Sequence, residues 1–175
     1  MLDEDRRDKA VELDPWWVVT GNALRFLLGG ASLVLGLLWI LLNVHSASAA
    51  VDAAVGTVLA LGGLVLLMPH RIRLPRRTTA AVMAGTAVAG TAAGLLVVRS
   101  KTCCMFAYIT DRGWPFQWAQ RGAVADDPGT AFRVARTSPW SADLVSLATD
   151  LLIWSYVGLI LVVAVVLIRR VAHRG

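Results

Sequence analysis

Charged residues are scarce in this sequence. They make up 17% of its 175 residues, whereas a soluble globular domain normally carries about 25%. Hydrophobic residues make up 57%, and the mean hydropathy is +0.62. This balance indicates a chain that lies in a lipid bilayer and argues against a soluble domain.

Four long apolar stretches contain almost no charge, and they lack the alternation of apolar and polar residues that a membrane β-barrel requires. A helix crosses the hydrocarbon core of a bilayer in about 20 residues, and lipid leaves helices as the way to satisfy the backbone of such a stretch. We therefore predict an all-α fold, with one membrane domain over residues 1–175 built as a four-helix transmembrane bundle. The expected spans are 23–44, 49–68, 78–98 and 145–168, with an exoplasmic cap over 99–143.

Lysine and arginine are distributed unevenly between the two sides that these spans define. Basic residues concentrate in the cytoplasmic loops of membrane proteins. One side carries Arg6, Arg7, Lys9, Arg25, Arg71, Arg73, Arg76, Arg77, Arg169, Arg170 and Arg174. The other side carries Arg99, Lys101, Arg112, Arg121, Arg133 and Arg136, all in the long loop. We predict a multi-pass protein of the cell (plasma) membrane with both termini cytoplasmic. The net charge of +5 follows from this topology and suggests a basic rim on anionic lipids, with no nucleic acid as partner.

The third predicted span lacks bulky side chains until its last residues. Its small residues recur at helical spacing, and such residues allow helix backbones to approach closely in lipid. We expect this helix to lie at the packed centre of the bundle. The packing positions are Gly85, Ala89, Gly90 and Gly94.

The sequence also lacks the motifs of common enzymes and metal sites. It contains no GxSxG, P-loop or HExxH motif, and its three histidines fall on different sides of the predicted membrane. We predict no catalytic residue, no metal ligand set and no cofactor. An enzymatic role is the less favoured interpretation.

No acidic residue falls near the middle of a predicted span, which argues against a transporter with a site at the bilayer midplane. Four polar residues instead fall at one common level near the outer ends of the spans: His45, Asp52, Arg99 and Asp150. In the structural interpretation Arg99 pairs with one or both aspartates as they emerge into water. In the functional interpretation the two aspartates bind a cation, a proton or a cationic group, in a small transporter or channel formed by oligomerisation.

Cysteine is limited to the adjacent pair Cys103 and Cys104. The Cα atoms of neighbouring residues lie about 3.8 Å apart, whereas disulfides usually join Cα atoms about 4.4–6.8 Å apart. A disulfide within the pair would be strained and readily reduced, which would suit a membrane thiol/disulfide redox protein. The alternatives are a bridge to another chain or two free thiols near the membrane interface. The favoured interpretation is a pair of residues that stiffens the start of the loop or fills space.

The loop over 99–143 is too long for a passive connection, because loops beyond about 12–15 residues without secondary structure are uncommon. We expect a short helix at 114–119 and a start of the fourth helix capped by Ser141. Large aromatic residues in this loop would contact either the outer leaflet or a partner protein. They are Trp114, Phe116, Trp118 and Trp140.

These features favour a non-catalytic subunit or accessory factor that packs in a larger membrane assembly. Its expected partners are other integral membrane proteins, in a hetero-complex or a homo-oligomer, together with membrane lipids. The membrane redox protein and the small transporter or channel stay open as alternatives.

Overall fold

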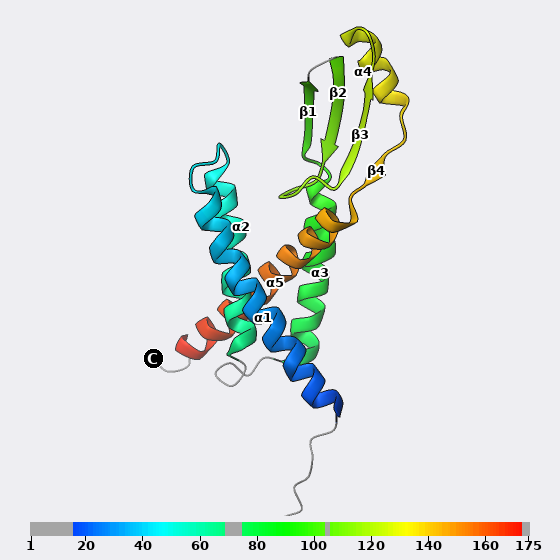
Figure 1. Ribbon diagram of the computed structural model, residues 1–175. Coiled ribbons are helices and arrows are strands. Elements are labelled where there is room, and N and C mark those ends of the chain that lie inside the picture. The colour runs from blue at the N-terminus through cyan, green and yellow to red at the C-terminus, as the bar shows by residue number, and fades with distance from the viewer. Residues whose placement is uncertain (1–15, 69–74, 104–105, 173–175) are drawn as a thin grey trace, which may run out of the picture.

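The computed structural model describes residues 16–68, 75–103 and 106–172. Four long helices form a stem, and a small α/β head stands at one end of it (Figure 1). The stem consists of α1 (Trp16–Asn43), α2 (Ala49–Leu67), α3 (Arg76–Gly94) and α5 (Leu144–Ala172). The head consists of β1 (Val98–Cys103), β2 (Ala107–Arg112), β3 (Ala119–Val124), α4 (Pro128–Thr137) and β4 (Ser141–Ala142).

Three stem helices are long and apolar enough to cross a membrane. They are Val18–Asn43 of α1, the whole of α2 and the whole of α5. Their limits agree within a few residues with the predicted spans 49–68 and 145–168, whereas α1 begins well before residue 23. The chain is thus a membrane protein by the length and composition of its helices.

The third predicted span differs from the other three. It forms a 19-residue helix, α3, which is not among the candidate spans because arginine, threonine and glycine lower its hydropathy. The helix also ends at Gly94, although the prediction continued to residue 98. The N–H groups of Leu95, Leu96 and Val97 each bond the carbonyl three residues earlier, a tightening that is common where helices end.

The prediction of an all-α fold is wrong in the cap. Residues 98–142 contain an antiparallel sheet with strand order β1-β2-β3-β4, in which Arg99 of β1 lies opposite Asp111 of β2 and Asp111 lies opposite Gln120 of β3. The short helix expected at 114–119 is also wrong, because 113–118 is a loop and β3 begins at Ala119. These strands are short and polar, so no apolar run in the sequence indicates their presence.

Helix α4 covers one face of the sheet. The rings of Tyr108 and Phe132 meet edge to face at 5.1 Å between centroids, while Ala131 and Ala135 are buried beneath the helix. Asp127 caps its N-terminus by accepting a hydrogen bond from the Thr130 N–H at 3.0 Å. Hydrogen bonding from Thr130, first from its side chain and then from this N–H, lowers the pKa of Asp127.

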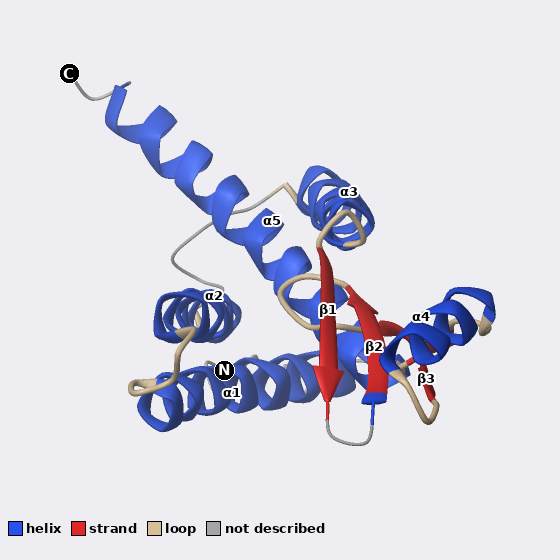
Figure 2. Ribbon diagram, turned by 90° about the horizontal axis from the view of Figure 1, so that it is seen from above, coloured by secondary structure: helices blue, strands red, loops and turns tan. Residues whose placement is uncertain are grey.

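The stem is built from two helix pairs, α1 with α2 and α3 with α5. In the first pair, glycines bring the backbones together: a Cβ on Gly36 would lie 2.6 Å from the Ala60 nitrogen. The pairs are joined by Tyr156 of α5, whose hydroxyl lies 2.8 Å from Ser32 Oγ of α1. Figure 2 shows that α5 crosses the stem obliquely, away from the head.

Candidate functional site

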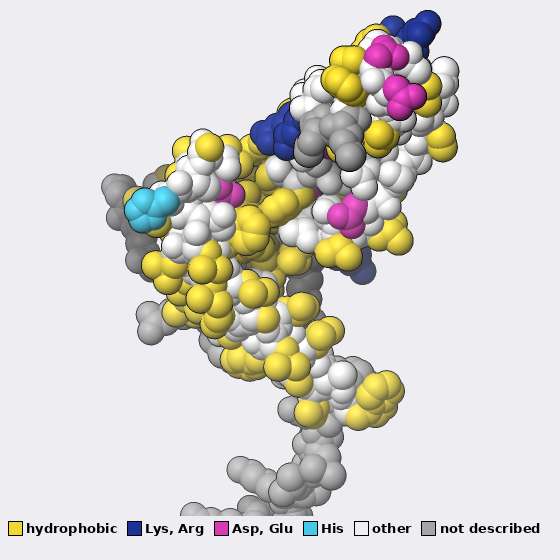
Figure 3. All heavy atoms as spheres, turned by 45° about the horizontal axis from the view of Figure 1, so that its top comes forward, with side chains coloured by type: hydrophobic (Ala, Val, Ile, Leu, Met, Phe, Trp, Pro, Cys, Tyr) yellow, Lys and Arg dark blue, Asp and Glu magenta, His cyan; other side chains and the backbone are white. Residues whose placement is uncertain are grey.

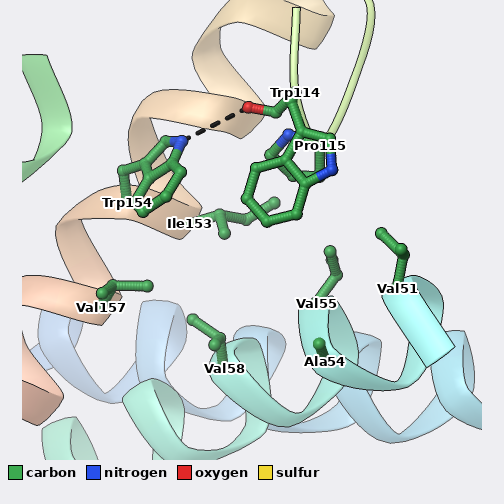
Figure 4. A pocket seen from close by; sticks show the side chains of 9 residues that line it. All are labelled: Val51, Ala54, Val55, Val58, Trp114, Pro115, Ile153, Trp154 and Val157. Atoms are coloured by element: carbon green, nitrogen blue, oxygen red, sulfur yellow. Dashed lines mark hydrogen bonds between the residues drawn. The ribbon is translucent and has the colours of Figure 1, made fainter. Parts of the chain in front are cut away.

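The loop over 113–118, here called the junction loop, connects β2 to β3 and descends from the head onto the stem. Trp114 packs against Trp154 of α5 with ring centroids 5.6 Å apart, and the Trp154 Nε1–H donates to the Trp114 carbonyl at 3.4 Å (Figure 4). The Trp114 backbone also lies on Gly94 at the end of α3, where a Cβ would come within 2.8 Å of the Trp114 carbonyl oxygen. The loop therefore contacts both helices of the α3–α5 pair.

The same loop reaches the α1–α2 pair through Phe116 and Pro115. The Phe116 ring meets Trp39 of α1 edge to face at 5.5 Å, and Pro115 faces α2 across a cavity. The junction loop thus contacts α1, α3 and α5, and it faces α2 across the cavity, at the end of the stem that carries the head.

Asp150 of α5 fixes this loop from below. Its Oδ1 accepts a hydrogen bond from the Phe116 N–H at 3.0 Å. The side chain is fully buried, with 0% exposed, and its Oδ2 has no hydrogen-bond partner. Burial of a carboxylate is costly, so an apolar residue would be expected at position 150. The hydrogen bond to the Phe116 N–H is the interaction that compensates for part of this cost.

A cavity of about 80 Å³ lies under the junction loop, between α2 and α5 (Figure 4). Its lining is wholly apolar, so it offers hydrophobic contact and no group to orient a polar ligand. The lining residues are Val51, Ala54, Val55, Val58, Trp114, Pro115, Ile153, Trp154 and Val157.

The predicted polar cluster is spread over three places in the structure. Asp52 accepts hydrogen bonds from Ser46 Oγ at 2.5 Å, Ser48 Oγ at 2.9 Å and Trp39 Nε1 at 3.3 Å, which closes the turn between α1 and α2. His45 is exposed in that turn. Among the described residues it is the only histidine, and it is coloured cyan in Figure 3.

Arg99 lies in β1 of the head, and Asp150 lies under the junction loop. Within the part of the chain that the structure describes, no ion pair joins Arg99 to Asp52 or Asp150. The structure connects the two aspartates through Trp39 instead, since its Nε1–H donates to Asp52 while its ring packs on Phe116, the partner of Asp150.

Of the two cysteines, Cys103 is the last residue of β1, and Cys104 lies outside the described residues. The redox hypothesis for this pair stays a prediction.

The four predicted packing positions of α3 face different ways. A Cβ on Gly90 would overlap the Trp154 indole, and Gly94 lies on the Trp114 backbone. Gly85 has no atom within 4 Å of its Cβ position, and Ala89 is exposed. Gly90 and Gly94 thus pack inside the chain, while Gly85 and Ala89 lie on the outer face of α3.

Three of the four aromatic residues expected to contact lipid or a partner lie against the chain itself. Trp114, Phe116 and Trp118 are half-buried, and Trp118 lies over Gly113. Trp140 keeps 42% of its surface exposed. It lies in the segment between α4 and α5, where Asp143, not the expected Ser141, caps α5 through bonds from the N–H of Val145 and the hydroxyl of Ser146. These bonds, the Ser146 hydroxyl first, lower the pKa of Asp143.

A cluster of arginines around Trp140 was not predicted from the sequence. The guanidinium carbons of Arg112 and Arg121 lie 5.0 and 4.5 Å from the Trp140 ring centroid. Both arginines belong to the sheet face that α4 covers. Arg112 lies on the same face of β2 as Tyr108, which contacts Phe132 of α4, and Arg121 lies opposite Thr110 on that face. The signal in the sequence is the alternation of these arginines with their neighbours, and both were interpreted only as charges of the loop over 99–143.

No group of three or more histidine, cysteine, aspartate or glutamate residues that could hold a metal ion occurs among residues 16–68, 75–103 and 106–172. Comparisons with protein-family models, with curated proteins and with solved structures find no match.

Proposed function

We propose that the chain crosses the cell membrane four times, with α3 as a span in addition to α1, α2 and α5, and that both termini are cytoplasmic. Helix α3 packs against α5, and it runs from the end of the stem remote from the head up to the head itself (Figure 1). Its 19 residues extend about 28 Å, close to the thickness of a hydrocarbon core of about 30 Å.

The positions of the basic residues support this orientation. Arg77, Arg169 and Arg170 lie at helix ends remote from the head. Arg25 binds the α2 terminus there, since its Nε–H donates to the Leu66 carbonyl at 2.8 Å. An excess of arginine at this end is typical of the cytoplasmic side, which leaves the head outside.

We propose further that the protein is a non-catalytic accessory subunit of a larger membrane assembly, and that the head docks a partner. The observation that carries this proposal is the sheet face opposite α4, here called the open face. Its exposed positions alternate along β3, and Ile109 and Val124 have exposed fractions of 37% and 70%. The open face includes Arg99, Lys101, Ile109, Gln120, Gly122 and Val124.

The chemistry of the open face favours a partner with an apolar surface flanked by acidic groups. Arg99 and Lys101 are exposed beside the apolar positions, whereas Asp111, the carboxylate on the same face of β2, is buried. Complementary charge would orient such a partner. The outer edge of β1 has no partner strand among the described residues and could accept one by β-augmentation.

Photo-crosslinking in native membranes tests the docking proposal. A photoreactive amino acid at Val124 or Lys101 should give discrete adducts with an acidic-surfaced membrane protein, identified by mass spectrometry. The matched control is Arg133, which is exposed on α4 on the other side of the sheet. Absence of adducts at both open-face positions, or equal adducts at Arg133, would contradict the proposal.

Cysteine labelling tests the topology separately. In a Cys103→Ser, Cys104→Ser background, a membrane-impermeant maleimide should label Asp126→Cys in intact cells and Arg170→Cys only after lysis. The reverse pattern would show that the head is cytoplasmic.

A further inference from the structure

The head carries two arginines whose charges have no carboxylate partner. Arg112 and Arg121 both lie against the Trp140 ring, and within the described part of the chain neither forms an ion pair. The nearest acidic residue in sequence to Trp140 is Asp143, whose two oxygens accept bonds at the start of α5. Two positive charges held beside one indole ring favour the binding of an anion from outside the chain.

The donor groups left over suit a phosphate. The Nε atoms of both arginines are buried and lack hydrogen-bond partners, so an anion would bind through the terminal Nη groups. Nη1 of Arg121 donates to the Arg136 carbonyl at 3.1 Å, which fixes the position of this guanidinium. A tetrahedral oxyanion bound by the two guanidiniums can accept several charge-assisted hydrogen bonds at once.

The surroundings of this cluster place it next to lipid. Trp140 is 42% exposed, and the first two residues of α5, Leu144 and Val145, are 72% and 77% exposed. A tryptophan followed by exposed aliphatic residues at the start of a membrane helix is typical of the head-group level of a bilayer.

The length of α5 gives the same level. About 20 residues counted back from Arg169, the first basic residue of its last turn, reach the level of Asp150 at the edge of the hydrocarbon core. Leu144 lies six residues farther out, about 9 Å along the helix axis, and the oblique course of α5 shortens this height (Figure 1). The Trp140 cluster therefore falls within the head-group layer.

We propose that Arg112 and Arg121, supported by Trp140, bind the phosphate of an anionic phospholipid head group. The assignment to the outer leaflet rests on the proposed topology, whereas lipid binding itself requires neither that topology nor a protein partner. Bound lipid would anchor the head beside the start of α5 and hold the open face at a fixed height above the bilayer.

Native mass spectrometry of the full chain in detergent, titrated with phosphatidylglycerol or phosphatidylcholine, measures this binding. We expect phosphatidylglycerol to bind more tightly than phosphatidylcholine. The double variant Arg112→Gln, Arg121→Gln should weaken phosphatidylglycerol binding by about 25-fold, since each arginine near an anionic surface contributes about fivefold. Lysine at both positions should give an intermediate affinity, because it keeps the charge and loses the bidentate geometry.

The matched control is Arg99→Gln, Arg133→Gln, which removes the same charge elsewhere on the head and should change the affinity by less than about threefold. An equal loss of phosphatidylglycerol affinity in the two double variants would show that only the net charge of the head matters, and it would overturn the proposal. Inorganic phosphate is titrated in the absence of lipid; if it binds as tightly and needs the same arginines, the site belongs to a soluble anion and the lipid assignment is wrong. Should the double variant fail to fold, the single variants and Trp140→Leu replace it, and unchanged binding in all three would refute the site.

Discussion

The bond between Asp150 and the junction loop gives the sharpest test of how the head is attached to the stem. In the structure Asp150 is fully buried, its Oδ1 accepts the Phe116 N–H, and its Oδ2 is unpaired. If the hydrogen bond is what matters, a neutral acceptor of the same size should replace the carboxylate. If the negative charge matters, it should not.

Asp150→Asn keeps an acceptor oxygen and removes a buried charge, so we expect its free energy of unfolding to stay within about 1 kcal/mol of wild type. Asp150→Leu leaves the Phe116 N–H buried and unpaired, which costs about 1–3 kcal/mol. For a chain of this length that corresponds to a fall in Tm of about 2–4 °C per kcal/mol.

Thermal unfolding in detergent measures the change in stability of the whole chain. Hydrogen exchange across the junction loop measures the change in its local stability. The leucine variant should exchange faster at 113–118 than wild type, and the asparagine variant should not. Asp126→Asn and Asp126→Leu, at an exposed head carboxylate, are the controls and should change neither measurement. A loss of stability as large in Asp150→Asn as in Asp150→Leu would refute the hydrogen-bond argument and return Asp150 to the cation-binding hypothesis.

Two further predictions concern the helix packing of the stem. Gly90→Ala should lower the free energy of unfolding by about 1–3 kcal/mol, because the added Cβ overlaps the Trp154 indole. Gly85→Ala, where the added carbon meets nothing within 4 Å, should be neutral or stabilising by up to about 1 kcal/mol; equal effects of the two alanines on the unfolding midpoint would show that the α3–α5 contact is misplaced. A double-mutant cycle of Ser32→Ala and Tyr156→Phe should give a coupling of about 0.5–1.5 kcal/mol for their buried hydroxyl pair, and a coupling of zero would count against the contact between the two helix pairs.

Hydropathy predicted the three apolar helices of the stem and missed the strands of the head. The spans at 49–68 and 145–168 agree closely with α2 and α5, because transfer into lipid depends on the composition of a single stretch. Strands β1, β2 and β3 of the head are only six residues long, and β4 has only two. Their signal in the sequence is an alternation that can be interpreted only once Phe132 of α4 is known to cover Tyr108.

The candidate site shows the same division. The sequence identified Asp52, Asp150 and the aromatic residues around Trp114 as unusual, since polar groups in membrane segments and clustered tryptophans are uncommon. It placed Asp52, Arg99 and Asp150 in one cluster because residues at equal depth in different helices have no lateral coordinate in the sequence. The structure instead pairs Asp150 with a backbone N–H of the head and Asp52 with the turn that follows α1.

The sequence by itself determined that this is a membrane protein and where its apolar helices run, because these properties follow from the transfer free energy of contiguous residues. Only the tertiary structure decided what the segment around Trp114, Phe116 and Trp118 contacts. That segment packs on α1, α3 and α5 of its own chain, because the sheet sets the position of a loop between two strands and no local pattern in the sequence encodes that position. The same sheet brings Arg112 and Arg121 from two strands to the Trp140 ring, where the proposed contact between the head and the lipid lies.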